Sequence, residues 1–284
     1  MSTNDIRGRL ALITGASGGI GSACAHKLAE NGAHLALTYS TNLAAIQSLH
    51  ADLQSRHPDL RISTHKVDLR SATDITLLFD QIIAQHDGHS PDILISNAGT
   101  GKRITNIWDI DLSDFDDMIT TNLRASFILV KGVVEHMKAQ RWGRIVFMSS
   151  IAAYGGGING CPSKGGLTGM MKNLATRLSE YNISVNDVAP AMIGDTGMIP
   201  NAEAVPEVVK GIPLGRLGTP EETANVVLML VTTGYSSRTG LTMEGEVGFR
   251  EVWLDALSQP KLLWKVIVLE QYPRCDSANN ECYK

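Results

Sequence analysis

The sequence has no long apolar run. Its longest aliphatic stretch, residues 226–231, is far shorter than the roughly 20 residues that a transmembrane helix needs. Residues 1–9 lack the basic-then-apolar order of a secretory signal, because Asp5, Arg7 and Arg9 precede any apolar run. We therefore expect a cytoplasmic protein without a membrane partner.

An excess of charge of one sign is also absent. The chain has 25 Lys and Arg against 29 Asp and Glu, a net charge of −4, and no long basic run, which argues against a nucleic-acid partner. Cysteine is scarce, and no Cys-x-x-Cys pair or nearby histidine cluster accompanies Cys24, Cys161, Cys275 or Cys282. We expect free thiols and no metal site.

Apolar segments of strand length alternate with segments that carry apolar residues at helical spacing. The strand-like segments are residues 10–14, 34–39, 62–67, 93–97, 144–149 and 183–188, each too apolar for an edge strand. The helix-like segments include residues 20–31, 72–85, 115–140 and 165–181. Because parallel strands need such crossovers, the pattern predicts a single α/β domain of the Rossmann type, a doubly wound parallel sheet with helices on both faces.

Two regions break this alternation. Residues 190–213 are rich in Pro, Gly and Met without clear periodicity, which suits a lid beside the ligand cleft. We therefore expect one domain over residues 1–248, followed by an atypical tail over residues 249–284. The tail could form a helix from Trp253, Leu254, Leu257, Leu262, Leu263, Trp264, Val266 and Ile267.

The first strand-like segment leads into a glycine-rich turn at residues 14–21, Thr-Gly-Ala-Ser-Gly-Gly-Ile-Gly. Glycine lets the backbone approach a pyrophosphate closely, and the free N–H groups at the start of the next helix attract its charge. Glycines also make ordinary turns, so the strand–turn–helix setting is what indicates a dinucleotide. The expected cofactor contacts in this loop are Gly15, Ser17, Gly19, Ile20 and Gly21.

The spacing of this loop resembles the short-chain dehydrogenase/reductase family, and further motifs of that family follow in order. They are Asp68, Ser96-Asn97-Ala98-Gly99, Asn122 with Lys131 beyond it, Ser149-Ser150, Ser163-Lys164-Gly165 and the loop of residues 190–196. Taken singly, Asn97 and Asp68 could cap helices or turns, Asn122 could be an ordinary polar helix residue, and Ser149-Ser150 an ordinary strand end. Their common order favours the family interpretation.

The resemblance implies a role for each matching residue. Ser150 polarises the substrate carbonyl, Lys164 holds the nicotinamide ribose, and Asn122 holds a water in the proton relay. Cofactor contacts outside the glycine loop are expected from Ser40, Asp68, Asn97, Lys131, Lys164, Ile193 and Thr196. Relatives also commonly form homodimers or homotetramers through helices equivalent to residues 115–140 and 165–181.

The end of the second strand bears on the choice between NAD and NADP. An NAD-specific site usually has an acidic residue there, whereas this chain has Thr38-Tyr39-Ser40-Thr41-Asn42. Small hydroxyl and amide groups can accept a 2′-phosphate, so NADP is favoured over NAD. One residue argues against NADP, because Gly18 occupies the position at which many NADP-preferring relatives have an arginine.

One motif of the family is missing, the tyrosine of Tyr-x-x-x-Lys, which moves the proton. The position four residues before Lys164 is Gly160, and the family's usual interval from Ser150 leads to Ser163. The segment between Ser150 and Lys164 is shorter than in relatives, and the tyrosine is lost with it. Tyr154 is the one nearby substitute, and a place in the pocket wall suits it better than a role as acid, because it has no fixed geometry toward both Ser150 and Lys164.

Two functions remain open. The resemblance to 3-oxoacyl-carrier-protein reductases and to ketoreductases of secondary metabolism implies an NADP-dependent oxidoreductase that reduces a keto group of an acyl or polyketide-like small molecule. The missing tyrosine favours an alternative, a cofactor-binding protein with impaired or no catalysis that regulates a partner.

Overall fold

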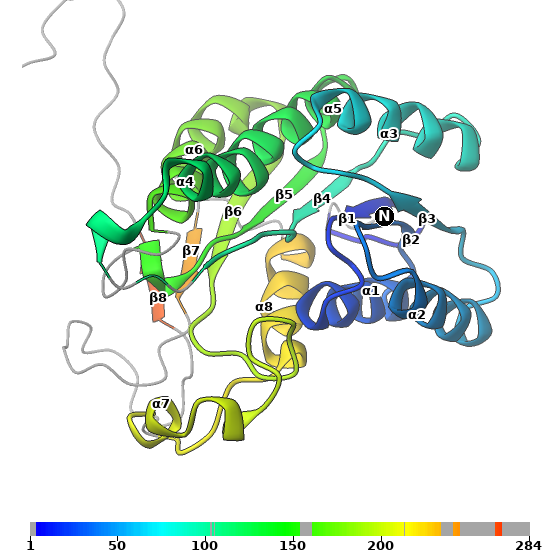
Figure 1. Ribbon diagram of the computed structural model, residues 1–284. Helices are drawn as coiled ribbons and strands as arrows, with labels where there is room; N and C mark the ends of the chain where they lie inside the picture. Colours follow the sequence, from blue (N-terminus) through cyan, green and yellow to red (C-terminus); the bar gives the residue numbers. More distant parts are fainter. Residues whose placement is uncertain are drawn as a thin grey trace, which may run out of the picture.

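Eight strands form one sheet in the computed structural model, which describes residues 4–102, 104, 106–153, 161–212, 214–233, 241–244 and 265–268 (Figure 1). The strands are β1 (Leu10–Ile13), β2 (His34–Tyr39), β3 (Ile62–Lys66), β4 (Ile93–Ser96), β5 (Gly143–Met148), β6 (Ile183–Ala189), β7 (Leu241–Glu244) and β8 (Lys265–Val268). Their order across the sheet is β3-β2-β1-β4-β5-β6-β7-β8. All pairs are parallel except the antiparallel pair of β7 and β8.

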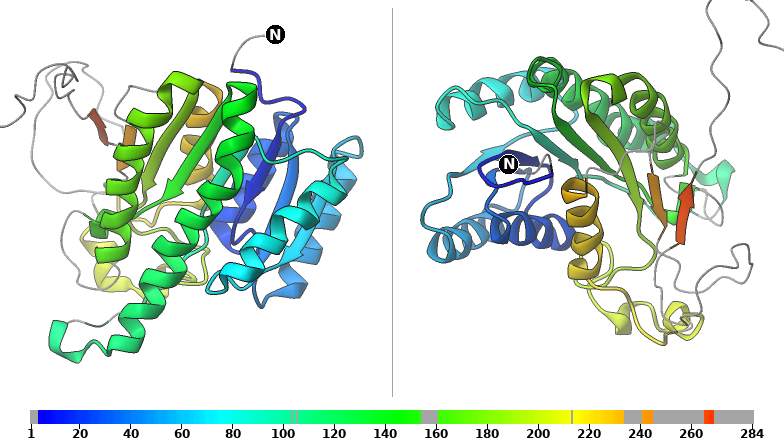
Figure 2. Two further views of the ribbon diagram at one scale, coloured as in Figure 1. Left: turned by 90° about the horizontal axis from the view of Figure 1, so that it is seen from above. Right: turned by 180° about the vertical axis from the view of Figure 1, so that it is seen from behind.

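Helices cover both faces of this sheet (Figures 1 and 2). One face carries α1 (Gly19–Glu30), α2 (Leu43–Arg56) and α8 (Pro220–Thr232), and the other carries α3 (Ala72–Gln85), α5 (Ala125–Gln140) and α6 (Cys161–Leu178). Successive strand residues enter opposite cores, so Ile13 packs with the first set of helices and Leu12 with the second. The predicted Rossmann-type, doubly wound single domain is confirmed.

The prediction that every strand is too apolar for an edge is wrong for β3. This strand ends the sheet and, among the described strands, pairs with β2 alone. Its exposure alternates, with Ser63 and His65 buried and Lys66 exposed. The sequence pattern also did not single out α2, because this helix buries only the narrow stripe of Ile46, Leu49 and Leu53.

The single helix predicted for residues 115–140 is interrupted. α4 (Leu112–Met118) and α5 are joined by a π-helical stretch, Ile119–Arg124. A π-helical turn widens the helix locally and is frequent at functional sites. This stretch contains the buried Asn122, so the interruption lies where the resemblance predicts catalytic chemistry.

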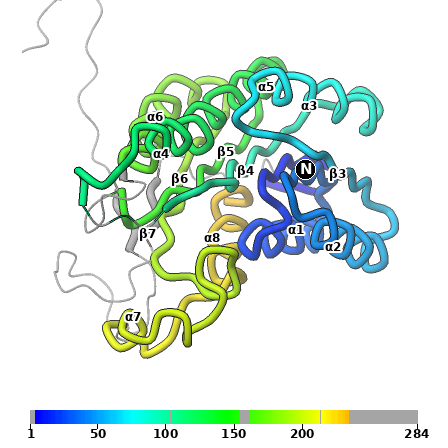
Figure 3. Tube along the Cα trace, in the orientation of Figure 1, coloured from blue at the N-terminus to red at the C-terminus, as the bar shows by residue number. Residues whose placement is uncertain are grey.

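Two further segments leave the regular alternation. After β6 the chain swings away from the sheet, carries α7 (Pro206–Lys210) and returns to α8 (Figure 3). In the tail, β8 extends the sheet, so a helix is the wrong prediction for Val266 and Ile267. The other apolar tail residues lie outside the described part of the chain.

Cys24 is a buried free thiol on α1, and burial raises its pKa to about 12. Cys275 and Cys282 lie outside the described residues. None of the described helices is both long and apolar enough to cross a membrane. The same part of the chain gathers no group of three His, Cys, Asp or Glu side chains that could hold a metal ion.

Candidate active site

A cleft of about 860 Å³ opens at the carboxyl ends of the parallel strands. Its walls come from the loop after β1, the ends of β2 and β3, the loop after β4, the end of β5, and the segment after β6. It brings together twelve of the residues predicted from the sequence: Gly15, Ser17, Gly19, Ile20, Gly21, Ser40, Asp68, Asn97, Ser150, Lys164, Ile193 and Thr196.

The glycine loop is packed so closely that side chains would not fit. Gly15 has φ +64°, and a Cβ on Gly21 would lie 2.4 Å from the carbonyl oxygen of Gly15. A Cβ on Gly19 would lie 2.2 Å from the carbonyl oxygen of Asp195, in the segment after β6. Gly19 therefore contacts the predicted lid, a constraint that the sequence did not indicate, in addition to its expected approach to a pyrophosphate.

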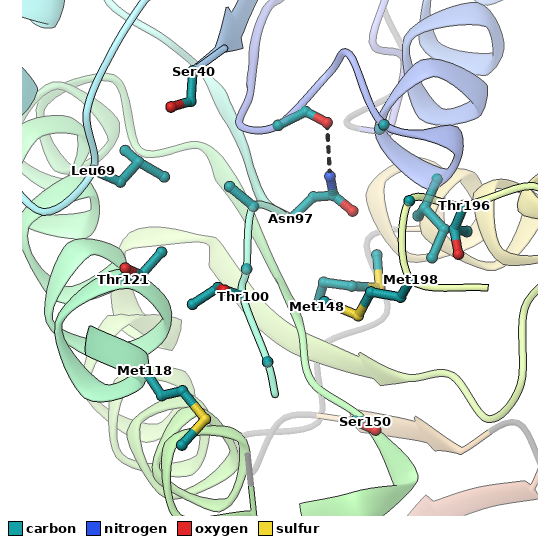
Figure 4. Close-up of a pocket in the computed structure, with 18 of the residues that line it drawn as sticks. Ser40, Leu69, Asn97, Thr100, Met118, Thr121, Met148, Ser150, Thr196 and Met198 are labelled. Carbon is teal, nitrogen blue, oxygen red and sulfur yellow. Dashed lines mark hydrogen bonds between the residues drawn. The ribbon is translucent and has the colours of Figure 1, made fainter. Parts of the chain in front are cut away.

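Asn97 ties the loop after β4 to the loop after β1. Its Nδ2 donates to the carbonyl oxygens of Thr14 at 2.9 Å and Gly15 at 3.3 Å. Figure 4 shows one hydrogen bond of Asn97 as a dashed line. The backbone N–H groups of Asn97 and Ala98 both donate to Oγ1 of Thr14, each at 3.0 Å. Asn97 thus fixes the glycine loop at its strand end, which is a positioning role at the cleft.

The expected adenosine end of the cleft combines small polar groups with an ion pair. Tyr39, Ser40 and Thr41 line it after β2, where no carboxylate stands. Asp68 after β3 pairs with Arg70, whose Nη2 lies 2.8 Å from Oδ2. Hydrogen bonds from Arg70 lower the pKa of the Asp68 carboxyl. Arg70 is a cleft residue that no sequence motif indicated, although its place two residues after Asp68 is a usable signal.

The opposite end of the cleft holds Ser150 and Lys164. Nζ of Lys164, in the first turn of α6, donates to the carbonyl oxygen of Met148 at 2.7 Å. Burial lowers the pKa of this ammonium group to about 8. Oγ of Ser150 accepts from the N–H of Ala152 at 3.2 Å, and Oγ of Ser149 donates to the carbonyl oxygen of Lys164 at 3.2 Å. The bond between Ser149 and Lys164 thus joins the segment directly after β5 to the first turn of α6 at the cleft.

Asn122 lies behind the cleft wall instead of lining it. Its Nδ2 donates to the carbonyl oxygen of Thr100 at 2.9 Å and to Oγ of Ser163 at 3.0 Å, while its Oδ1 accepts from the N–H of Thr100 at 2.8 Å. Asn122 and Ser163 are both 1% exposed. In this structure the side chain of Asn122 binds protein groups, whereas the resemblance implied that it binds a water molecule.

The comparison with known proteins decides the family. The model of the short chain dehydrogenase family matches residues 9–206, which is well over half of the chain. The chain belongs to the short-chain dehydrogenase family. It is therefore an oxidoreductase by family, built on that family's fold.

Among curated short-chain dehydrogenases, the 3-oxoacyl-acyl-carrier-protein reductase FabG of Rickettsia bellii (strain RML369-C) is 37% identical over 244 residues, covering 84% of this chain and 95% of that protein. The 3alpha-hydroxysteroid dehydrogenase of Mediterraneibacter gnavus (strain ATCC 29149 / DSM 114966 / JCM 6515 / VPI C7-9) is 33% identical over 250 residues, covering 84% and 97%. Among solved structures, a blue fluorescent protein from a metagenomic library in complex with NADPH aligns with TM-score 0.76 and 28% identity, covering 84% and 97%.

Of the residues predicted from the family resemblance, Asn122 and Lys131 do not line the cleft. Lys131 projects from the exposed side of α5, where its Nζ lies 6.0 Å from the ring centroid of Phe127, and it is not among the cleft-lining residues. A position nine residues beyond Asn122 is about 13 Å further along a helix, too far to share its site. Tyr154 and Gly160 lie outside the described residues.

Proposed function

We propose that this short-chain dehydrogenase uses NADPH to reduce a keto group of an acyl or polyketide-like substrate, in the cytoplasm and in secondary metabolite biosynthesis. The observation that carries the proposal is the single cleft that joins the glycine loop of residues 14–21 to Ser150 and Lys164. The 37% identity to a 3-oxoacyl-acyl-carrier-protein reductase over 95% of its length supports the keto substrate.

The residues of the cleft fit a dinucleotide. Gly15, Gly19 and Gly21 line the cleft at positions where a Cβ would crowd neighbouring protein atoms, and Ser17 lies beside them for the pyrophosphate. Ser40 and Thr41 offer hydroxyl groups to a 2′-phosphate, and Asp68 lies at the expected adenine position. A bound NADPH supplies the hydride for reduction. Ser150 would donate a hydrogen bond to the carbonyl oxygen and so stabilise the charge that develops on it.

The substrate side of the cleft is apolar as well as polar. The side chains of Met118, Met148 and Met198 line it and lie beyond Asn97 on the side of Ser150 (Figure 4). Methionine side chains are flexible and polarizable and adapt to irregular apolar ligands. This lining supports an acyl chain or a polyketide-like carbon skeleton next to the keto group.

Assembly as a homodimer or homotetramer is part of the proposal. The resemblance implies assembly through helices equivalent to α5 and α6, and Phe127 on α5 is 55% exposed. Sedimentation velocity of the purified chain tests it. A monomer at micromolar concentration would contradict the assembly without affecting the proposed reaction.

The decisive experiment mixes the purified chain with NADPH and a panel of β-keto esters and quinones and follows the absorbance of the reduced cofactor. Oxidation of NADPH that depends on a keto ester supports the proposed reaction. Binding of NADPH without oxidation supports the second candidate, a cofactor-binding protein that regulates a partner, which Gly160 in place of the family's tyrosine favours. Failure to bind either NADPH or NADH contradicts both.

A further inference from the structure

We infer that Lys164 itself delivers the proton to the substrate oxygen in this chain, in place of the tyrosine that its family uses. The inference rests on the proposed keto reduction and deepens it by naming the proton donor. The sequence excludes a tyrosine four residues before Lys164, because Gly160 occupies that position.

The position of Lys164 suits direct contact with a substrate. It lines the cleft together with Ser149 and Ser150, and its Nζ would come within 3.2 Å of a Cβ built on Gly99. The ammonium group therefore lies between the end of β5 and the loop after β4. One of its three N–H bonds is directed to the carbonyl oxygen of Met148 at 2.7 Å, and that carbonyl holds the group at the cleft.

The charged groups around Lys164 leave it without a counter-ion among the described residues. Lys102 after β4 pairs with Asp114 of α4, and Asp117 of α4 lines the same cleft. Asp187 of β6 accepts a hydrogen bond from Oγ1 of Thr168 at 2.5 Å, and Asp195 belongs to the lid. No described carboxylate forms an ion pair with Nζ of Lys164, so burial lowers the pKa of Lys164 to about 8. A proton donor works best when its pKa lies near the working pH.

The step balances with NADPH as the reductant. The carbonyl carbon gains a hydride, the π electron pair of the C=O bond moves to oxygen, and a new C–H bond forms. The oxygen takes a proton from Nζ, whose N–H bond breaks, so the products are an alcohol, NADP⁺ and the neutral amine of Lys164. The amine regains its proton from solvent. A lysine can carry out this step because, unlike arginine, it loses its proton readily when buried.

The first test uses no cofactor. Competitive labelling of the full chain with acetic anhydride at several pH values, read by peptide mass spectrometry, measures the titration of the Lys164 amine. We expect a midpoint near 8, with Lys172 on the exposed side of α6 as the internal reference. A Lys164 midpoint equal to that of Lys172 would overturn the inference.

The second test compares Lys164→Arg, Lys164→Ala and the matched control Lys172→Arg. Loss of a general acid lowers the rate by about 10² to 10⁴, so we expect Lys164→Arg to lose turnover by that factor and Lys172→Arg to lose none. Added ethylamine should restore turnover to Lys164→Ala. When a less basic amine replaces ethylamine, turnover of the rescued Lys164→Ala variant should begin to fall at a lower pH. Circular dichroism and NADPH titration of each variant confirm folding and cofactor binding.

The outcomes separate the two proposals. A wild-type chain that binds NADPH but reduces no ketone contradicts the proposed reaction. It also contradicts the role of Lys164 as proton donor, because that role depends on the reaction. A wild-type chain that reduces ketones while Lys164→Arg retains its rate, or Lys164→Ala shows no rescue by amines, overturns Lys164 as the donor and leaves the reaction standing. Full loss of turnover in Tyr154→Phe would likewise overturn it and assign the proton to Tyr154.

Discussion

Nδ2 of Asn122 donates a hydrogen bond to Oγ of Ser163 at 3.0 Å, between residues 41 apart in the sequence. The same side chain binds both the N–H and the carbonyl oxygen of Thr100. One buried amide therefore joins the π-helical stretch before α5, the loop after β4 and the first turn of α6. The cleft wall depends on this junction.

Replacing Asn122 by alanine should lower the free energy of unfolding by about 1 to 3 kcal/mol, because two hydrogen bonds to the backbone of Thr100 are lost, each worth about 0.5 to 1.5 kcal/mol. Urea unfolding followed by circular dichroism measures the change. Ser163→Ala is the matched control, since it removes one acceptor and keeps the bonds to Thr100. Equal stability of Asn122→Ala and the wild type would show that Asn122 has no structural role.

NADPH should bind more tightly than NADH, and Thr41→Asp should reverse this preference. A carboxylate at the end of β2 repels a 2′-phosphate and accepts a hydrogen bond from a ribose 2′-hydroxyl. We expect the ratio of the two dissociation constants to change by about tenfold or more, equivalent to about 1.4 kcal/mol. Fluorescence titration with both cofactors checks this, with Thr41→Ser as the control. Equal affinity of the wild type for NADH and NADPH would contradict the assignment.

Gly19→Val should abolish cofactor binding. Its Cβ would meet the carbonyl oxygen of Asp195 at 2.2 Å and crowd the approach to a pyrophosphate, so the glycine loop and the lid must move apart. Gly169→Ala in α6 is the control, because a Cβ there has no atom within 4 Å and should raise stability by about 0.5 to 1 kcal/mol. Unchanged NADPH affinity in Gly19→Val would show that the phosphate loop lies elsewhere.

Stability should fall on mild acidification because of a buried histidine pair. Oγ of Ser63 lies 2.7 Å from Nε2 of His65 and 2.8 Å from Nε2 of His86. Burial, reinforced by the neighbouring positive charges of His65, His34 and Arg61, lowers the pKa of His86 from 6.5 to about 4. Between these values the unfolded chain binds a proton that the folded chain does not, so the folded state loses on the order of 2 kcal/mol as pH falls.

Urea unfolding of the wild type at about pH 7 and pH 5 tests this, since most carboxylates stay ionised over that range. His86→Gln should show a smaller difference between the two pH values than the wild type. The exposed His89→Gln should keep the wild-type difference. A wild type with equal stability at both pH values would show that His86 titrates normally.

Inserting three residues that recreate Tyr-x-x-x-Lys before Lys164 should raise turnover, because the tyrosine then donates the proton and Lys164 is left to hold the nicotinamide ribose. Tyr154→Phe in the unaltered chain should change turnover little. Both rates are read from oxidation of NADPH with the best keto ester of the panel. Ordinary turnover of the unaltered chain that Tyr154→Phe removes would show that Tyr154 is the acid.

The sequence predicted the parts of the fold that depend on local pattern. β2 and α3 have the predicted bounds, because a short apolar run and a regular apolar stripe after the capping Ser71 leave little choice. The edge position of β3 depends on the order of strands, which no local pattern encodes. The π-helical stretch at Asn122 could not be predicted either, because the spacing of its apolar residues resembles that of the helices on both sides.

The positions of site residues could likewise be predicted only where they depend on local pattern. Motif spacing predicted that the glycine loop, Asn97, Ser150 and Lys164 lie together, and all of them line one cleft, since they lie near strand ends that must meet at one edge of the sheet. It misplaced Lys131, which lies on a long helix that leads away from that edge. It also missed the contact of Asp195 with Gly19, because the path of the segment after β6 depends on tertiary packing.

The antiparallel pairing of Leu241–Glu244 with Lys265–Val268 has a consequence for solubility. An uncovered edge strand presents unpaired N–H and C=O groups that can template pairing with other chains. With β8 in place, β7 is hydrogen-bonded on both sides, between β6 and β8. Truncation after Glu244 would leave β7 with one open side, so β8 keeps the backbone groups of β7 from pairing with another chain.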